Sequence, residues 1–139
     1  MRSLQPASVP TMYFMGVSTG QSSIMRLFPQ WAGVLGIEAQ LVGWDIPLDA
    51  STETYRELVS FIKQDPLSKG ALVTTHKIHV LAAARDLFDQ LDPYAELFDE
   101  ISCIAKNPAG LVGFAKDPIS SRLAMEAFIP DGFCIHSDI

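Results

Sequence analysis

Short apolar runs alternate with stretches of helical period along the first two thirds of the chain. The runs are rich in β-branched and apolar residues and predict buried strands at 11–19, 40–46 and 71–75. The stretches that follow them repeat apolar residues every three or four positions and predict helices at 22–35, 52–64 and from 76 to about 91. This βα alternation predicts a mostly parallel sheet with helices on both faces, which is a three-layer α/β/α domain.

Two of the predicted helices have a clear apolar face. In the first, the residues that share one face are Ile24, Leu27, Phe28, Trp31 and Leu35. In the second, the residues at core spacing are Tyr55, Leu58, Val59 and Ile62. We expect both faces to pack on the sheet, because an amphipathic helix buries its apolar side.

The last third of the chain has a different pattern. A short helical piece reaches Phe98, and two strand-like runs follow at 101–106 and 111–116. The residues between these runs, Asn-Pro-Ala-Gly at 107–110, favour a turn, so the pair predicts a C-terminal antiparallel hairpin. A final helix is predicted at 118–128, with Pro118 in its first turn.

The size and composition of the chain are those of one globular domain. It has 139 residues, of which 48% are hydrophobic and 19% charged, and this excludes a disordered or fibrous protein. We expect residues 11–129 to form the domain and residues 1–10 to be a loose tail. The stretch 130–139 has no clear period, so we expect an irregular tail or the start of a further domain.

Charge and cysteine content narrow the class of partner. The 10 Lys and Arg against 16 Asp and Glu give a net charge of -6 and form no basic patch, which argues against nucleic acid. The sequence contains no run of 18 or more apolar residues, so no membrane-spanning helix is predicted. The two cysteines, Cys103 and Cys134, form no disulfide framework, which favours a reducing compartment, the cytoplasm. A small molecule or a protein is the expected partner, and a homodimer is compatible with the sequence.

Ligands in an open α/β sheet bind beyond the carboxyl ends of the strands, so the loops after the strands are candidate sites. The loop at 18–23 is Ser-Thr-Gly-Gln-Ser-Ser and leads into a helix. Hydroxyls and free amides at a helix N-terminus suit a carboxylate or a phosphate. Alternatively, Ser22 or Ser23 only caps the helix.

A lysine and an aspartate follow two other strands. Lys77 stands in the first turn of a helix, where the helix dipole favours the neutral amine and a role in proton transfer; a solvent-facing lysine is the alternative. We expect the neighbouring His76 to be a structural or surface residue, as a lone histidine commonly is. Asp117 ends the hairpin, where it can pair with Lys77, although capping of the last helix also explains it.

Cys134, His136 and Asp138 alternate near the end of the chain, but no second ligand pair with zinc spacing accompanies them. We therefore predict no metal site.

Three motifs occur in a recognisable order: the strand, loop and helix at 16–31, VTTHK at 73–77 and LVGFAKD at 111–117. Together they resemble the N-terminal, substrate-binding domain of the shikimate dehydrogenase family, over about residues 12–128. In that family, the lysine of an Asn-Val-Thr-x-Pro-x-Lys motif and the aspartate of an Asn-Thr-Asp-Gly motif form the catalytic pair. The resemblance implies that Lys77 and Asp117 are this pair.

The resemblance also implies the reaction and the remaining site residues. The lysine exchanges a proton with the substrate oxygen while hydride passes between the substrate and NADP. Ser22 and Ser23 would bind the carboxylate of a shikimate-like substrate, and Thr74 and Ser102 would contact the same molecule. The sequence leaves open whether NADP or NAD is preferred.

The chain departs from the family's motifs at several positions. Ala71 or Leu72 stands near the motif asparagine, Thr75 at the proline, and Ser102 at the asparagine before the hairpin. Asn-Thr-Asp-Gly is replaced by Ala-Lys-Asp-Pro at 115–118. These changes favour a related polyhydroxy-carboxylate as substrate as much as shikimate itself.

The glycine-rich turn of a dinucleotide site is missing, since no G-x-G-x-x-G occurs in the chain. We therefore expect a shikimate dehydrogenase-like, NADP-dependent oxidoreductase whose nucleotide domain lies outside this chain, so that the chain alone is inactive. The alternatives are a non-catalytic module that binds a small carboxylate or a protein, and a flavodoxin-like phosphate or flavin binder.

Overall fold

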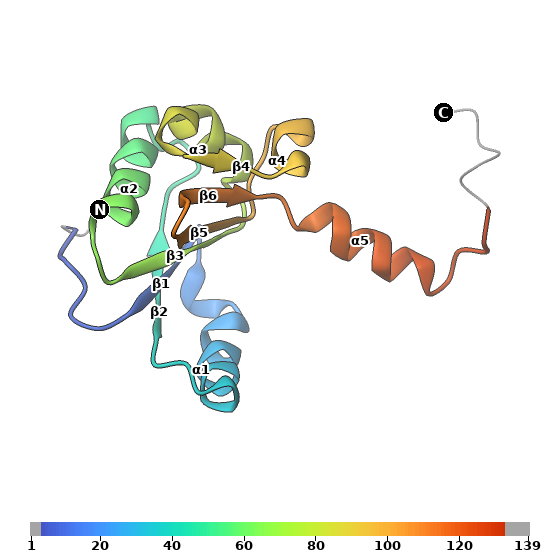
Figure 1. The fold of residues 1–139 in the computed structure, drawn as a ribbon, viewed down its shortest axis with the longest axis horizontal. Coiled ribbons are helices and arrows are strands. Elements are labelled where there is room, and N and C mark those ends of the chain that lie inside the picture. Colours follow the sequence, from blue (N-terminus) through green and yellow to red (C-terminus); the bar gives the residue numbers. More distant parts are fainter. Residues whose placement is uncertain (1–3, 133–139) are drawn as a thin grey trace.

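The computed structural model describes residues 4–132, which contain one six-stranded sheet flanked by helices (Figure 1). Across the sheet the strand order is β2-β1-β3-β5-β6-β4. The strands are β1 (Thr11–Gly16), β2 (Gln40–Asp45), β3 (Ser68–Val73), β4 (Gln90–Leu91), β5 (Cys103–Asn107) and β6 (Gly110–Phe114). Three of the neighbouring pairs are parallel and two are antiparallel, so the sheet is mixed with a parallel majority.

Helices cover both faces of the sheet, as the βα alternation predicts (Figure 1). Helix α1 (Ile24–Leu35) lies on one face, and α2 (Thr52–Gln64), α3 (Lys77–Ala84) and α4 (Pro93–Phe98) lie on the other. A last helix, α5 (Asp117–Glu126), extends away from the sheet and buries no residue. The three-layer α/β/α class is therefore confirmed.

The predicted hairpin is also confirmed. Strands β5 and β6 pair antiparallel from Cys103 opposite Phe114 to Asn107 opposite Gly110. The turn at its end is tight: the side chain of Asn107 accepts a hydrogen bond from the amide of Ala109 at 2.8 Å. Gly110 has φ 108°, a backbone conformation that glycine adopts without strain. Through β5 the hairpin joins β3 and so continues the sheet.

The hydrophobic core lies between the sheet and the layer of α2 and α3. All four residues of the predicted core face of α2 are buried: Tyr55, Leu58, Val59 and Ile62. They meet buried side chains from the sheet, among them Met15 of β1, Val73 of β3 and Ile104 of β5. This helix therefore forms where its apolar period predicts it.

One predicted helix is too long. The helix expected from 76 to about 91 ends at Ala84, and a 3-10 turn (Arg85–Leu87) leads from it into the short strand β4. The reason is pairing with the hairpin: the amide of Asp89 donates to the carbonyl of Leu111 at 2.8 Å, and the amide of Leu111 donates to the Asp89 carboxylate at 2.7 Å. Local periodicity contains no information on this long-range contact.

The first strand and the first helix are both shorter than predicted. Strand β1 ends at Gly16, and a 3-10 turn (Thr19–Gln21) precedes α1. Beyond Gly16 the chain leaves the sheet: the Gly16 carbonyl accepts from the amide of Ile46, and the amide of Thr19 turns to the side chain of Asp45. The loop is therefore held by the end of β2.

The predicted core face of α1 is only partly buried. Ala32 is the one residue of this helix in the buried class, whereas Trp31 and Leu35 expose 53% and 69% of their surface. The expectation that the whole apolar face packs on the sheet is wrong for these two residues. The apolar arc of α1 is wider than the part of the sheet that it contacts.

Candidate functional site

The structure joins Lys77 and Asp117, which are 40 residues apart in sequence, in an ion pair. Lys77 is the first residue of α3 and Asp117 the first residue of α5. The Lys77 ammonium donates a hydrogen bond to the Asp117 carboxylate. Lys77 is not a freely solvated surface lysine, since only a quarter of its side chain is exposed (25%). Asp117 is not the N-cap of α5, because Lys116 occupies that position and Asp117 is the first residue of the helix.

A buried network fixes the residue before Lys77. His76 lies within the fold at 1% exposure; its Nε2 is 3.0 Å from the carbonyl of Ile46, and its Nδ1 is 2.8 Å from the hydroxyl of Tyr55. A carbonyl only accepts, so Nε2 carries the proton and Nδ1 accepts from Tyr55. Burial lowers the pKa of His76, which favours this neutral form. His76 is thus a buried structural histidine, one of the two roles expected for it from the sequence.

Ser102 fixes the residue before Asp117. Its hydroxyl accepts a hydrogen bond from the amide of Lys116 at 2.9 Å, and its own amide donates to the carbonyl of Phe114 at 2.8 Å. The side chain is buried, so its hydroxyl positions the backbone that carries Asp117. The Lys116 ammonium lies 4.6 Å from the centre of the Phe114 ring, a cation–π contact.

The loop after β1 carries Ser22 and Ser23, and it leads into α1. Ser23 is the N-cap residue, but its side chain makes no capping hydrogen bond. Within residues 4–132, the amides of Ser23 and Ile24 also donate to no acceptor. The side chain of Ser23 therefore does not cap α1. Its hydroxyl and these two amides at the positive end of the helix are available to an anion.

Asp45 holds this loop in place. Its carboxylate accepts from both the amide and the hydroxyl of the buried Thr19, at 2.8 and 2.7 Å. Asp45 is not among the site residues predicted from the sequence. The signal that points to it is its place, an acidic residue at the carboxyl end of a predicted strand.

Thr74 lies beside the same loop. Its amide and its hydroxyl both donate to the carbonyl of Met15, at 3.1 and 3.3 Å. At Gly16 an added Cβ would come within 3.0 Å of the Thr74 hydroxyl and 3.2 Å of the Thr19 methyl. The segment that leads to Lys77 and the loop that leads to Ser22 are therefore in close contact, and Gly16 permits that approach.

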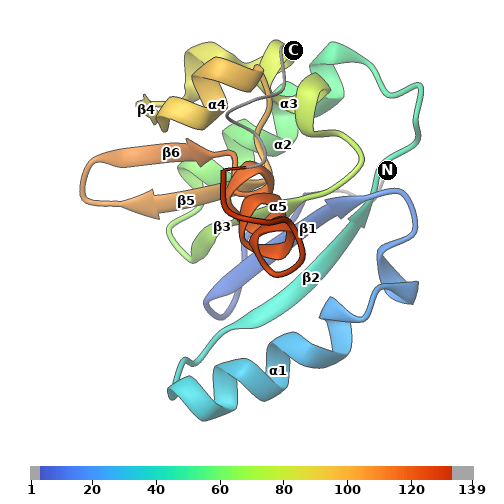
Figure 2. The ribbon, with the colours of Figure 1, turned by 90° about the vertical axis from the view of Figure 1, so that its right-hand side faces the viewer.

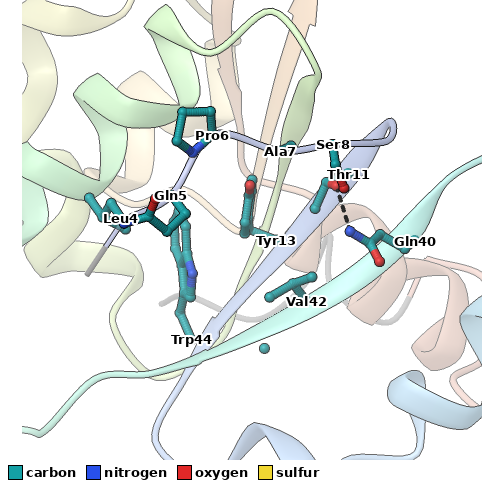
Figure 3. Close-up of a pocket in the computed structure, with 11 residues that line it drawn as sticks. Leu4, Gln5, Pro6, Ala7, Ser8, Thr11, Tyr13, Gln40, Val42 and Trp44 are labelled. Atoms are coloured by element: carbon teal, nitrogen blue, oxygen red, sulfur yellow. Dashed lines mark hydrogen bonds between the residues drawn. The ribbon is translucent and has the colours of Figure 1, made fainter. Parts of the chain in front are cut away.

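A cavity of about 250 Å³ lies elsewhere, under the N-terminal segment (Figure 3). Strands β1 and β2 supply Tyr13, Gln40, Val42 and Trp44 to its wall, and residues 4–8 cover it. None of the six predicted site residues lines this cavity, and its wall contains no acid or amine. It therefore offers a substrate carboxylate neutral hydrogen-bond donors and no positive charge.

Within residues 4–132, no group of three His, Cys, Asp or Glu side chains is placed to hold a metal ion. No helix of that part is both long and apolar enough to cross a bilayer. The predictions on Cys134, His136 and Asp138 fall outside the described residues.

Comparison with solved structures identifies the fold, whereas no protein-family model and no curated protein sequence matches the chain. Shikimate dehydrogenase 1 of Peptoclostridium difficile superposes with a TM-score of 0.69 at 18% identity, over 86% of this chain and 41% of that one. The Thermus thermophilus enzyme, solved with NADP(H) and shikimate, gives 0.63 at 21% identity, over 84% and 41%. The chain has the fold of the N-terminal domain of shikimate dehydrogenases.

A reductase of different substrate shares this fold. The 5-ketofructose reductase of a Gluconobacter species superposes with a TM-score of 0.64 at 14% identity, over 87% of this chain and 41% of that one. The chain thus spans about two fifths of the length of these structures.

The described residues do not fit a dinucleotide. The amide of Thr19, in the loop after β1, is occupied by the Asp45 carboxylate, whose charge would repel a phosphate at that point. The chain also lacks a G-x-G-x-x-G turn.

Proposed function

We propose that this chain is the substrate-binding half of an NADP-dependent oxidoreductase related to shikimate dehydrogenase, which interconverts 3-dehydroshikimate and shikimate or a related polyhydroxy-carboxylate pair. The observation that carries the proposal is the ion pair of Lys77 and Asp117. A lysine and an aspartate from two distant segments meet at the positions that the family's catalytic motifs predict. The fold supports the same assignment.

Lys77 serves as the general acid and base in this proposal. Its ammonium has three N–H donors, and the bond to Asp117 uses one of them. The others can reach the substrate oxygen and give it a proton as a ketone becomes a hydroxyl; in the reverse direction the amine takes that proton back. Asp117 orients the lysine and accepts a hydrogen bond from a neighbouring substrate hydroxyl.

Ser22 and Ser23 bind the substrate carboxylate. The support is the unused Ser23 hydroxyl and the amides of Ser23 and Ile24 at the start of α1. Charge-assisted hydrogen bonds of this kind are about twice as strong as neutral ones. Thr74 and Ser102, whose hydroxyls bond to the backbone in the fold, would contact the substrate only through a shift of those bonds.

The identity of the substrate is the part of the proposal that the motif departures affect most. Ala115 and Ser102 replace two asparagines, so two amides that could bind hydroxyls are missing. The fold also occurs in a 5-ketofructose reductase. Quinate and 5-ketofructose are therefore the comparators for shikimate. The nucleotide would have to be held by another domain or chain.

Calorimetric titration of this chain with shikimate, without nucleotide, tests the proposal. We expect saturable binding that Lys77→Ala and Asp117→Ala each weaken at least tenfold, because each removes a partner of the substrate oxygens. Lys69→Ala is the matched control. Lys69 is exposed on β3, so this substitution removes the same charge at a position away from the site. This control should bind as the unchanged chain does.

Three results would count against the proposal. Absence of binding of all three compounds at millimolar concentration, in a chain shown to be folded, would remove the substrate site. Equal weakening of binding by Lys69→Ala would show that the loss of affinity follows from the change in net charge and not from the position of Lys77. Binding that survives Lys77→Ala unchanged would leave a carboxylate-binding module without the catalytic role.

A further inference from the structure

The cavity under the N-terminal segment lies at the edge of the sheet where β1 and β2 run side by side (Figures 1 and 2). Tyr13 of β1 and Trp44 of β2 stack in its wall, with ring centroids 4.0 Å apart. Phe61 of α2 meets both rings edge-on, at 5.8 Å from each. The aromatic pair is therefore supported by α2, on the face of the sheet opposite α1.

Residues 4–8 form the cover of this cavity (Figure 3). They contain no helix or strand, and Leu4 packs against the hydrophobic core. The amide of Ala7 donates to the Asp65 carboxylate at 3.4 Å, which is long for a hydrogen bond. The cover can therefore lift without breaking the sheet, and this gives a small molecule a way in.

The wall of the cavity is uncharged. None of the residues that line it is an acid or an amine, and burial raises the pKa of the Tyr13 hydroxyl, which keeps that group neutral. The Asp65 carboxylate at the cover already accepts hydrogen bonds from Ser68 and Ala7. A charged ligand would lose its water here without gaining an opposite charge in the wall, so a neutral ligand is favoured.

The hydroxyls of Ser8 and Thr11 and the amide of Gln40 lie at one end of the cavity, away from Trp44 (Figure 3). The Gln40 side chain donates to the Thr11 hydroxyl at 3.0 Å, and that hydroxyl donates to the carbonyl of Val9 at 2.8 Å. Within residues 4–132, the Ser8 hydroxyl has no such bond and can bind a ligand. The cavity thus combines aromatic rings with a neutral polar end.

The volume of the cavity suits one substituted ring. An apolar cavity of about 150 Å³ holds benzene, so about 250 Å³ has room for a ring and a hydroxyl group. We propose that this cavity binds a small neutral phenol, with its ring against Tyr13 and Trp44 and its hydroxyl toward Ser8. Aromatic rings gain from both stacked and edge-to-face contacts. None of the six predicted site residues lines the cavity, so this binding goes beyond the proposed function.

Titration of the ¹⁵N-labelled chain with phenol tests the site, because the indole N–H groups of the two tryptophans report separately. We expect a saturable shift of the Trp44 indole and the Gln40 amide at millimolar phenol, whereas the indole of Trp31, on α1, should keep its position. Cyclohexanol lacks the aromatic ring and benzoate carries a charge, so each should bind at least tenfold more weakly than phenol. Trp31→Phe assigns the two indole signals.

Two variants fill the cavity. Val42→Phe should abolish the shift, because the larger side chain occupies the space that phenol needs. Ala7→Phe should do the same from the cover, outside every helix and strand, so it tests the site even where Val42→Phe impairs folding. Val34→Phe on α1 is the matched control: Val34 is 88% exposed on the other face of the sheet, so this variant should bind phenol as the unchanged chain does.

A Trp44 indole signal that phenol leaves unchanged would overturn the proposal. So would binding that survives either filling variant in a folded chain, which the dispersion of the amide signals checks. Equal affinity for benzoate or cyclohexanol would contradict the class of ligand, and loss of binding in Val34→Phe would contradict its location. None of these outcomes depends on shikimate, so this proposal and the proposed function fail separately.

Discussion

At the residue scale, the buried hydrogen bonds around His76 link three parts of the fold. The ring receives a hydrogen bond from Tyr55 of α2 and donates one to Ile46 after β2, while its own backbone starts α3 beside Lys77. All side-chain polar atoms buried within residues 4–132 have a hydrogen-bond partner. Loss of this ring would therefore leave the Tyr55 hydroxyl and the Ile46 carbonyl unsatisfied and would loosen the support of Lys77.

The first prediction concerns pH. Because burial holds the pKa of His76 below its ordinary 6.5, the unfolded chain binds a proton there more readily than the folded chain does. The free energy of unfolding should be undiminished above pH 6.5 and should fall as the pH drops below it, by at most about 1.4 kcal/mol per pH unit from this group. Urea unfolding at pH 7.5, 6.5 and 5.5 measures the slope.

His76→Phe should remove this part of the pH dependence and lower the stability at pH 7.5 by about 1–3 kcal/mol, the cost of the two unsatisfied groups. His79→Gln is the comparison variant: His79 is exposed one turn along α3, its ring stacks on that of Tyr55 at 6.2 Å and its charge contributes to the lowered pKa of His76. Since burial is the larger cause of that shift, His79→Gln should reduce the slope without abolishing it. A slope that is the same in His76→Phe would assign the pH dependence to other groups.

At the element scale, the sequence predicts those elements whose pattern reports local burial. Helix α2 begins and ends where its apolar spacing indicates, and the hairpin follows from its turn residues. Strand β4 could not be predicted in this way, because it exists through hydrogen bonds to β6 that lie about twenty residues further along the chain. The exposure of Trp31 likewise depends on how much of α1 the sheet covers. The periodicity of the sequence carries no information on that coverage.

The second prediction concerns the contact between β3 and β5. Gly70 has φ 143°, and an added Cβ would lie 2.0 Å from the carbonyl oxygen of Ile104 in the backbone of β5. Gly70→Ala should therefore lower the free energy of unfolding by at least about 1–3 kcal/mol, as a strained backbone residue does. In Gly33→Ala the new methyl group meets nothing within 4 Å, and it should stabilise α1 by about 0.5–1 kcal/mol.

Urea unfolding of both alanine variants measures the two changes under the same conditions. The opposite signs separate the close approach at Gly70 from the general effect of replacing glycine. Equal stability of Gly70→Ala and the unchanged chain would mean that β3 and β5 do not approach as closely as the structure has them.

At the scale of the whole molecule, the proposed site draws on four separate segments of the chain. Sequence alone points to Lys77, Asp117, Ser22 and Ser23, because each follows a predicted strand and carries the chemistry of acid–base catalysis or anion binding. It does not show Asp45 or Tyr55 as supporting residues, since their contacts span 26 and 21 residues and depend on the packing of the fold. The pairing of Lys77 with Asp117, expected from the sequence, is present in the structure as an ion pair.

The central claim is that a hydroxy acid binds between the Lys77–Asp117 pair and the loop of Ser22 and Ser23. Titration of the ¹⁵N-labelled chain with shikimate, followed by amide chemical shifts, tests it most directly because it shows where the ligand lies. We expect the largest changes at the amides of these four residues. Changes confined to Gln40 and Trp44 would place the ligand in the cavity under the N-terminal segment and contradict the account, as would a spectrum that shikimate leaves unchanged.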